Sequence, residues 1–348
     1  MAHTRQTSFE ELEYQRGRQR RQTRKARKLE LLGSTTCWED LVALVEPHRP
    51  KAGGRGRQPW PTETLLRMYF VQVWLNLSDE ATEDECYDSL AVRDFVGCYD
   101  GVPDATTLAN FRHLIEDEHI DELYFEAVVE RLDEAGLISH GGTVIDATMV
   151  ESTKSTKNAT GERDPEMHQA KKGKNWHHGM KVHTGEDALG GYIHSATFTP
   201  ANTSDISEAH NLVREDDEFC NVDAGYQGIE KRPEIKGDEH LRDVEFRVAM
   251  RPGRLKEKRK LGDVVWADLH EENRKASTRA RAEHPYRYLK QVFGYAKTAY
   301  RGLRKNAARI RMILASTNVM MAGKAGRAGE YLSPDSGTVV SRTKAKAA

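Results

Sequence analysis

The hydrophobic pattern of this chain changes at Gly141, and the change limits the folds that it can adopt. Between residues 62 and 135 the apolar side chains recur at the three- and four-residue spacing of helices that bury one face. After Gly141 they form short runs separated by Gly and polar residues, as in strands. This order predicts an α+β fold, in which an all-α N-terminal domain precedes a mixed β-sheet flanked by helices.

The part of the chain before Gly141 is predicted to be helical. Helices are expected at residues 37–45, 62–77, 83–96, 106–116 and 120–135. Asp104 or Thr106 can cap the fourth of them, which would bury Leu108 and Phe111. A helix-turn-helix that enters a DNA groove is one interpretation of this segment. The acidity of the region supports packing or dimerisation equally well.

The half after Gly141 is predicted to alternate between strands and helices. Strands are expected at residues 143–145, 177–185, 190–199, 219–222 and 242–250. Helices are expected at residues 204–213 and 277–306. Residues 152–175 are polar, rich in Lys and without a hydrophobic period, so a mobile loop is predicted there.

Two aspartates follow apolar strands in this half. Asp146 ends the run from Thr143 to Ile145, and Asp223 ends the run from Phe219 to Val222. In open α/β sheets, ligands bind at the carboxyl ends of the strands. Each aspartate alone is more often a turn residue or a helix cap, so the interpretation depends on the two occurring together with a third acid.

The third acid is Glu283, within the basic helix predicted at residues 277–306. Helical spacing would place Arg279, Glu283, Arg287 and Lys290 in one narrow stripe. For an isolated acid, such a stripe usually means solvated ion pairs. Pro285, two residues after Glu283, would interrupt the helical hydrogen bonds and allow a kink beside the acid. Aromatic residues at a seven-residue period provide a core-facing side: Tyr286, Phe293 and Tyr300.

Together, Asp146, Asp223 and Glu283 predict a catalytic metal site. Carboxylate oxygens are ligands that Mg²⁺ prefers, along with phosphate oxygens and water. Two Mg²⁺ ions, for which Mn²⁺ can substitute, would lie about 4 Å apart and catalyse an in-line phosphoryl displacement. Zinc is disfavoured, because the four cysteines have no CxxC spacing. His177 and His183 would share one strand face without a Cys or carboxylate partner in spacing, which favours phosphate contacts or structural roles.

The net charge of -1 hides a strong asymmetry along the chain. Residues 16–28 hold eight basic side chains and no acid, and residues 251–311 hold eighteen basic side chains against six acids. Between them, residues 79–134 hold eighteen acids against three Arg. We predict that the basic segments bind phosphates of double-stranded DNA. The predicted DNA contacts are Arg20, Arg21, Arg24, Lys181, His183, Arg279, Arg287, Lys290, Lys297, Arg301, Arg304 and Lys305.

The composition predicts two folded domains between less ordered ends. A basic, partly disordered arm is expected at residues 1–33, a helical domain at 34–137, a catalytic domain at 141–320 and a disordered tail at 321–348. No apolar run approaches the roughly 18 residues of a membrane span. The amino terminus has no apolar signal core, so we expect a cytoplasmic protein without a membrane partner.

In combination, these motifs resemble insertion-sequence transposases of the DDE superfamily, in the group whose type element is insertion sequence five. VIDAT matches the family's first acid at Asp146, and NVDAGYQG matches its second at Asp223. The third acid of the family lies in a pattern of Tyr, two residues, Arg, three residues, Glu, six residues and Lys. Arg279, Glu283 and Lys290 fit this spacing, while Ala276 stands where the family has Tyr.

The resemblance implies an RNase H-like catalytic domain, as in retroviral integrases. It also implies an enzyme that binds the terminal inverted repeats of its insertion sequence, cleaves them and joins the 3′-hydroxyl ends to target DNA. A homodimer or higher oligomer on DNA and association with the prokaryotic nucleoid are expected. Two alternatives stay open: a nuclease without strand transfer, and a non-catalytic DNA-binding remnant that regulates an active relative.

Overall fold

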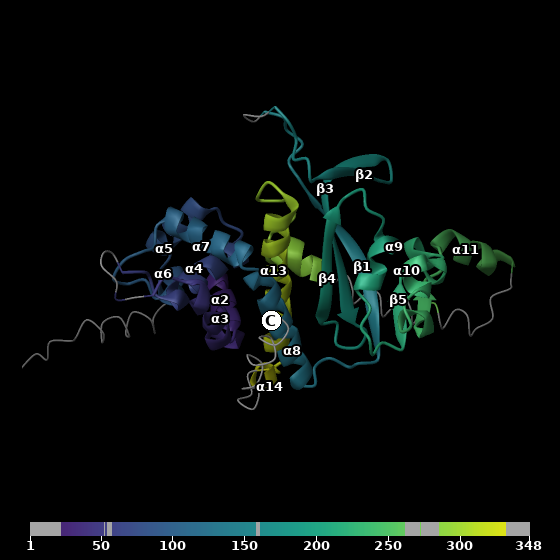
Figure 1. The fold of residues 1–348 in the computed structure, drawn as a ribbon, viewed down its shortest axis with the longest axis horizontal. Helices are drawn as coiled ribbons and strands as arrows, with labels where there is room; N and C mark the ends of the chain where they lie inside the picture. Colours follow the sequence, from purple (N-terminus) through teal and green to yellow (C-terminus); the bar gives the residue numbers. More distant parts are fainter. Residues whose placement is uncertain are drawn as a thin grey trace, which may run out of the picture.

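The structure is a computed structural model that describes residues 22–51, 53, 58–157, 161–261, 272 and 285–331. Four layers follow one another across the molecule (Figure 1). The N-terminal helices form one side, and the long helix α13 (Leu303–Lys324) lies in the middle. The sheet comes next, and short helices cover its far face. The predicted α+β fold with an N-terminal helical region is confirmed.

The N-terminal layer consists of helices, three of which begin with a side-chain cap. Side chains of Thr23, Ser78 and Asp104 each accept a hydrogen bond from a backbone N–H in the first turn that follows. Ser89 has an extended backbone, so the single helix predicted at residues 83–96 is wrong and two helices form there. The elements are α2 (Arg24–Thr35), α3 (Trp38–Val45), η1 (Glu46–His48), α4 (Thr62–Leu75), α5 (Asp79–Asp88), α6 (Leu90–Val96), α7 (Ala105–Asp117) and α8 (Ile120–Glu134).

The sheet is mixed, with the order β2-β3-β1-β5-β6, and β4 also pairs with β3. β3 runs antiparallel to β1, β2 and β4, whereas β5 runs parallel to both β1 and β6. Its strands are β1 (Gly142–Glu151), β2 (His168–Lys172), β3 (Asn175–Asp187), β4 (Ile193–Pro200), β5 (Phe219–Val222) and β6 (Glu245–Val248). The mobile loop predicted at residues 152–175 is therefore wrong in part, because β2 lies within it and pairs with β3.

Short helices connect the strands and follow them. Those between β4 and β6 are α9 (Asp205–Glu208), η2 (Ala209–Asn211), η3 (Ala224–Tyr226), η4 (Ile229–Lys231), α10 (Pro233–Lys236) and η5 (Leu241–Asp243). After β6 come α11 (Pro252–Leu261), the π-helical turn η6 (Tyr288–Val292), α13 and α14 (Ala328–Tyr331). None of the helices within the described ranges is long and apolar enough to cross a membrane.

Alternation along the strands gives the sheet two different faces. On the α13 side, Val150, Val182 and Ile193 join a large core that continues through α13 into the N-terminal helices. On the other side, Ile145 and Val222 join a smaller core that is closed by residues of η2, η4 and α10. Among the described residues, the helical half and the sheet thus share one core.

Helix α13 joins the two halves. Trp74 of α4 donates a hydrogen bond from its indole nitrogen to Ser316 at 2.8 Å. On the opposite side, the Asn318 amide bonds both the N–H and the carbonyl oxygen of Ile193 in β4, at 2.9 and 2.7 Å. Most of α13 is buried, although its sequence was not assigned to a helix of its own above.

The helix predicted at residues 277–306 is wrong in its second half. The π-helical turn ends at Val292, and a non-helical segment runs to Gly302 before α13 begins. Gly294 and Gly302 have φ of 74° and 95°, which L side chains rarely adopt, so the chain turns at both positions. Tyr300 therefore does not continue a helical stripe with Tyr286 and Phe293. Residues 273–284 lie outside the described residues.

The predicted ends of the folded body also need correction. The arm was expected to extend to residue 33, but α2 begins at Arg24 and buries Leu29 and Leu32 in the large core. The disordered tail was expected from residue 321, but α13 continues to Lys324, and Tyr331 of α14 is 2% exposed. In both places apolar side chains pack on neighbours that are distant in the sequence. Residues 1–21 and 332–348 lie outside the described residues.

Candidate active site

Asp146 and Asp223 lie side by side on neighbouring strands. The parallel pairing of β1 with β5 matches Gly142 to Phe219 and Val144 to Asn221. Continued by two residues, this register sets Asp146 beside Asp223, and neighbouring strands are about 4.8 Å apart. In-register residues on parallel strands point to the same face, so the two partly exposed carboxylates lie on one face of the sheet.

Asp146 lies within β1 and not at its end, which corrects the predicted strand of residues 143–145. β1 continues to Glu151 because β3 pairs with it along its whole length, from Thr143 with Asp187 to Glu151 with Gly179. Asp223 does follow directly after β5, as predicted. Its side chain accepts a hydrogen bond from Gly225 N at 2.6 Å and caps the η3 turn. The two aspartates therefore lie where β5 ends, beside the part of β1 that continues beyond it.

A buried polar chain holds β1 in place at Asp146. Tyr286, just before η6, donates its hydroxyl to the carbonyl oxygen of Asp146 at 2.6 Å. The same hydroxyl lies 2.7 Å from Oγ1 of Thr184, the residue paired with Asp146 on β3. Thr184 Oγ1 in turn lies 3.0 Å from Glu186 Oε1. Sequence reasoning assigned Tyr286 to the core and gave Thr184 and Glu186 no role at the site.

Glu186 is a buried acid beside this site. Its burial, with a smaller contribution from the charge of Asp146, raises the pKa of Glu186 well above the usual range, while the Thr184 hydroxyl opposes the shift. The shift favours the protonated carboxyl, and in that form Glu186 can donate a hydrogen bond to Thr184 Oγ1. In that state Thr184 can donate to Tyr286, and Tyr286 to the Asp146 carbonyl, so that each hydroxyl donates once.

The segment around η6 also brings a cation to this face of the sheet. Lys290 donates a hydrogen bond from Nζ to Thr148 Oγ1 at 2.7 Å. Thr148 lies two residues after Asp146 on β1 and therefore points to the same face. Arg287 is exposed. Glu283 and Arg279 lie outside the described residues, and Glu283 stands three positions before Tyr286 in the sequence.

The donor set is suited to a hard divalent cation. Two carboxylates on adjacent strands match the usual protein contribution to a Mg²⁺ site, in which substrate phosphates and water supply the remaining ligands. Within the described residues no group of three or more His, Cys, Asp or Glu is placed to hold a metal ion. The two aspartates therefore fit such a site in part, and the predicted third ligand, Glu283, lies outside the residues described.

Three of the predicted DNA contacts serve the fold instead. His183 is fully buried, with Nε2 at 2.8 Å from Thr199 Oγ1. Lys181 bonds Thr203 O at 2.6 Å and Asp205 at 2.8 Å. Arg304 binds both carboxylate oxygens of the buried Asp121, at 2.8 and 3.0 Å. His183 and Lys181 lie on the sheet face covered by short helices, and Arg304 joins α13 to α8, so the sequence could not reveal these partners.

Other predicted DNA contacts are exposed. They are Arg24, Arg287, Lys297, Arg301 and Lys305. Arg20 and Arg21 lie outside the described residues, as does Arg279. His177, for which no carboxylate partner was expected, has one: its Nδ1 lies 2.7 Å from Glu151 Oε1 on β1. The sheet pairing brings these two side chains together across 26 positions of sequence.

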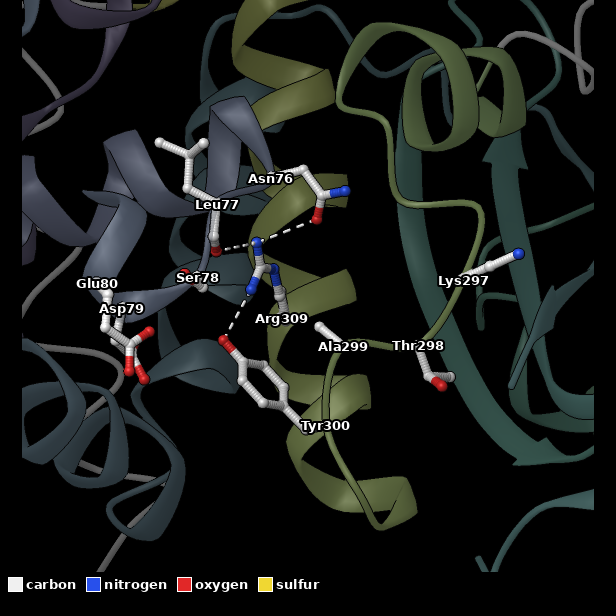
Figure 2. Close-up of a pocket in the computed structure, with 10 residues that line it drawn as sticks. All are labelled: Asn76, Leu77, Ser78, Asp79, Glu80, Lys297, Thr298, Ala299, Tyr300 and Arg309. Atoms are coloured by element: carbon white, nitrogen blue, oxygen red, sulfur yellow. Dashed lines mark hydrogen bonds between the residues drawn. The ribbon is translucent and has the colours of Figure 1, made fainter. Parts of the chain in front are cut away.

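A cavity of about 460 Å³ lies elsewhere, between the helical layer and the segment before α13 (Figure 2). Arg309 of α13 is 3% exposed and donates hydrogen bonds to Leu77 O, Asn76 Oδ1 and Tyr300 OH. Lys297 points away from this arginine, toward the sheet. Neither Asp146 nor Asp223 lines the cavity, so it belongs to the joint between the two halves of the fold.

The paired aspartates lie in a segment with known relatives. The family described as “Transposase DDE domain” matches residues 138–319, more than half of the chain. The chain belongs to the DDE transposase family. A second family, described as “Transposase domain (DUF772)”, matches residues 17–114, which include helices α2 to α6 and most of α7. No solved structure matches the chain. The family resemblance seen in the sequence is thereby confirmed, and the chain has a transposase role.

Proposed function

We propose that this chain is a DNA transposase that cleaves the ends of its insertion sequence and transfers the freed 3′-hydroxyl groups into target DNA. The observation that carries the proposal is the register of β1 and β5, which sets Asp146 beside Asp223 within the segment matched by the family. The proposed partners are the terminal inverted repeats and target DNA, bound by a homodimer or higher oligomer.

The strand order supports an RNase H-like catalytic domain. Strands β1, β3 and β4 form an antiparallel set, and β5 and β6 extend it from the far edge of β1 in parallel. Helices cover both faces of this sheet. In the proposed site, Asp146 and Asp223 supply two ligand side chains, and Glu283 is assigned as the third.

Divalent metal ions held by these acids would activate the attacking water or 3′-hydroxyl and stabilise the leaving oxygen. The residues of the chain have separate tasks in this proposal. The Tyr286 hydroxyl fixes the backbone of Asp146, so that the carboxylate does not have to be ordered when DNA binds. Lys290, which reaches Thr148 beside the acid, supplies a positive charge for the DNA phosphates. The exposed Arg287 is assigned to the same task.

The test is cleavage of duplexes that carry the flanking ends of the chain's own gene, with Mg²⁺ present. Asp146→Asn, Asp223→Asn and Glu283→Gln should each lower the single-turnover rate by at least roughly 100-fold, as expected for a lost preorganised electrostatic group. Binding of the ends should survive. Asp243→Asn is the matched control, because that side chain is 80% exposed and lies outside the site.

The outcomes separate the proposal from its alternatives. A variant that cuts at the wild-type rate would remove its residue from the site. Cleavage without joining of the 3′-ends to a target plasmid would identify a nuclease. Binding without cleavage by the wild-type chain would identify a regulatory remnant, and loss of binding in all three variants would make the acids structural.

A further inference from the structure

The hairpin formed by β2 and the first residues of β3 extends beyond the rest of the sheet (Figure 1). β1 pairs with β3 only from Gly179 onward and β4 only from Met180 onward, whereas β2 pairs with residues 175–179. A two-residue turn joins the strands, with Gly173 at φ 62° and Lys174 after it. The result is a free-standing two-stranded ribbon.

The base of this hairpin is anchored to the body. Asp164 accepts a hydrogen bond from Gly302 N at 2.7 Å, and Glu166 accepts one from Leu303 N at 2.6 Å. Both acids thereby satisfy unpaired N–H groups at the amino end of α13, where the helix dipole favours negative charge. Met167, just before β2, is 3% exposed and packs in the large core. The ribbon therefore has a fixed root.

Because Asp164 and Glu166 are bonded to the start of α13, most of the charged side chains that remain exposed in this region are cations. Residues 152–178 hold six Lys or Arg against three acids, and two of those acids are the ones bound to α13. The exposed cations on the ribbon and on the loop behind it are Lys154, Lys157, Arg163, Lys171 and Lys174. Lys154 also donates to Trp176 O at 3.2 Å, which ties that loop to the ribbon. A positive surface of this kind complements a polyanion.

Trp176 stands on this basic ribbon with 59% of its surface exposed. Its pairing partner on β2 is Lys171, so the indole and an ammonium group lie on the same side of the ribbon. An exposed aromatic ring beside lysines can contribute to DNA binding, because an apolar side chain can pack in a groove while the cations contact phosphates.

The ribbon leaves the sheet at the end where the active site lies. Because β3 is antiparallel to β1, the first residues of β3 lie beyond the carboxyl end of β1. Trp176 is eight positions from Thr184, which pairs with Asp146. Eight strand residues span at most about 26 Å, and this length corresponds to roughly eight base pairs of a duplex.

We propose that the β2–β3 hairpin binds double-stranded DNA beside the scissile phosphate. Lys171 and Lys174 contact the phosphates, and Trp176 packs against sugars and bases in a groove about eight base pairs or fewer from the cleavage position. A two-stranded ribbon fits the major groove of B-DNA. This inference rests on the proposed transposase function and adds a specific interaction surface to it.

Salt dependence of binding tests the lysines. In full-length protein without metal, Lys171→Gln combined with Lys174→Gln should reduce the slope of log affinity against log salt by about 1.8, or about 0.9 for each phosphate contact. Lys236→Gln is the control, since this exposed Lys lies on α10, which covers the other face of the sheet. An unchanged slope in the double variant would overturn the phosphate contacts.

Truncation of the indole tests the groove contact. Trp176→Ala should weaken binding of the ends roughly tenfold and remove protection from hydroxyl radicals within about eight base pairs of the cleavage position. Trp176→Phe should restore most of the affinity, because it keeps an aromatic ring. Leu189→Ala is the matched control: Leu189 is 68% exposed in the turn after the other end of β3.

The two hypotheses fail in distinguishable ways. If the wild type cleaves ends, Asp146→Asn does not, and Trp176→Ala binds and protects DNA like the wild type, then the hairpin inference is wrong and the transposase function stands. If Trp176→Ala alters self-association in sedimentation but leaves the footprint intact, the ribbon is a contact between copies and the inference is again wrong. If the wild type neither binds nor cleaves its ends, both fail.

Discussion

Asp146 and Asp223 occupy matching positions on neighbouring strands, but the fold holds them in different ways. Asp146 lies inside β1 with β3 paired beside it, and Tyr286 from a distant segment binds its carbonyl oxygen. Asp223 follows the last residue of β5, and its carboxylate binds Gly225, two residues further on. The backbone of Asp146 depends on long-range contacts, although its carboxylate also accepts a hydrogen bond from Ala147 N at 2.8 Å, whereas Asp223 is positioned by a local turn.

Each aspartate also has a buried tyrosine near it, and the two hydroxyls differ. The Tyr286 hydroxyl bonds both the Asp146 carbonyl and Thr184. Tyr226, whose N–H bonds Asp223 O at 3.1 Å, has a buried hydroxyl without a hydrogen-bond partner among the residues that the structure describes. Burial raises the pKa of both phenols well above 10, so both stay protonated. One hydroxyl thus helps to fix its site, and the other does not.

The largest expected effect comes from breaking the long-range contact at Asp146. Tyr286→Phe should lower the free energy of unfolding by about 2 kcal/mol, because the Asp146 carbonyl and Thr184 lose a buried partner. Cleavage should fall as well, because the backbone of Asp146 loses its support. Urea unfolding and single-turnover cleavage measure the two effects.

The matched control is Tyr226→Phe. Because its hydroxyl has no partner within the described residues, its removal should leave stability unchanged or slightly increased. Equal losses in the two variants would mean that the contrast between the tyrosines is wrong.

A smaller effect is expected at Asp223, where the turn is local. Asp223→Ala should lower stability by about 1 kcal/mol through loss of the cap, whereas Asp223→Asn keeps an acceptor and should change it by a few tenths at most. Both should lose metal-dependent cleavage. Thermal unfolding beside cleavage checks this separation, and an Asn variant as unstable as the Ala variant would show that charge, and not capping, holds the turn.

The two strands are tied together at their amino ends, and this tie has the smallest expected effect. His140, two residues before β1, binds Asp216, which lies before β5, and also Asp133 at the end of α8. Hydrogen bonds to Asp216 and then Asp133 raise the pKa of His140 above its ordinary value of 6.5. The protonated ring donates a hydrogen bond to each carboxylate, whereas the neutral ring has a single N–H and can donate to only one of them.

A raised folded-state pKa means that the His140 contribution is complete below pH 6.5 and is lost as pH rises through the folded value. Because the side chain is 47% exposed, the contribution should stay below about 1 kcal/mol. The difference in unfolding free energy between wild type and His140→Ala should therefore shrink as the pH rises above 6.5. A difference that grows over this range would contradict the sign of the shift.

Much of the local structure could be predicted from the sequence because it depends on neighbours along the chain. The cap at Asp104, the short strand before Asp223 and the hairpin between β3 and β4 all follow from local patterns. The apolar residues of α13 (Leu303–Lys324) are also spaced as in a helix. The predicted helix nevertheless ended at residue 306, because it was defined by the basic residues that precede this apolar run.

The family and the α+β order could be predicted from the sequence, as could the two aspartates that we propose as metal ligands, since all of these depend on residue types at fixed spacing. Which polar side chains are available to a ligand depends on the fold. Lys181, His183 and Arg304 look like DNA contacts in the sequence, yet each is engaged with a partner brought close by folding. Trp176 lies just before the strand predicted at residues 177–185, yet β3 begins at Asn175 and carries its indole beyond the neighbouring strands into solvent. Burial and pairing are set by residues distant in the chain, and local patterns do not contain that information.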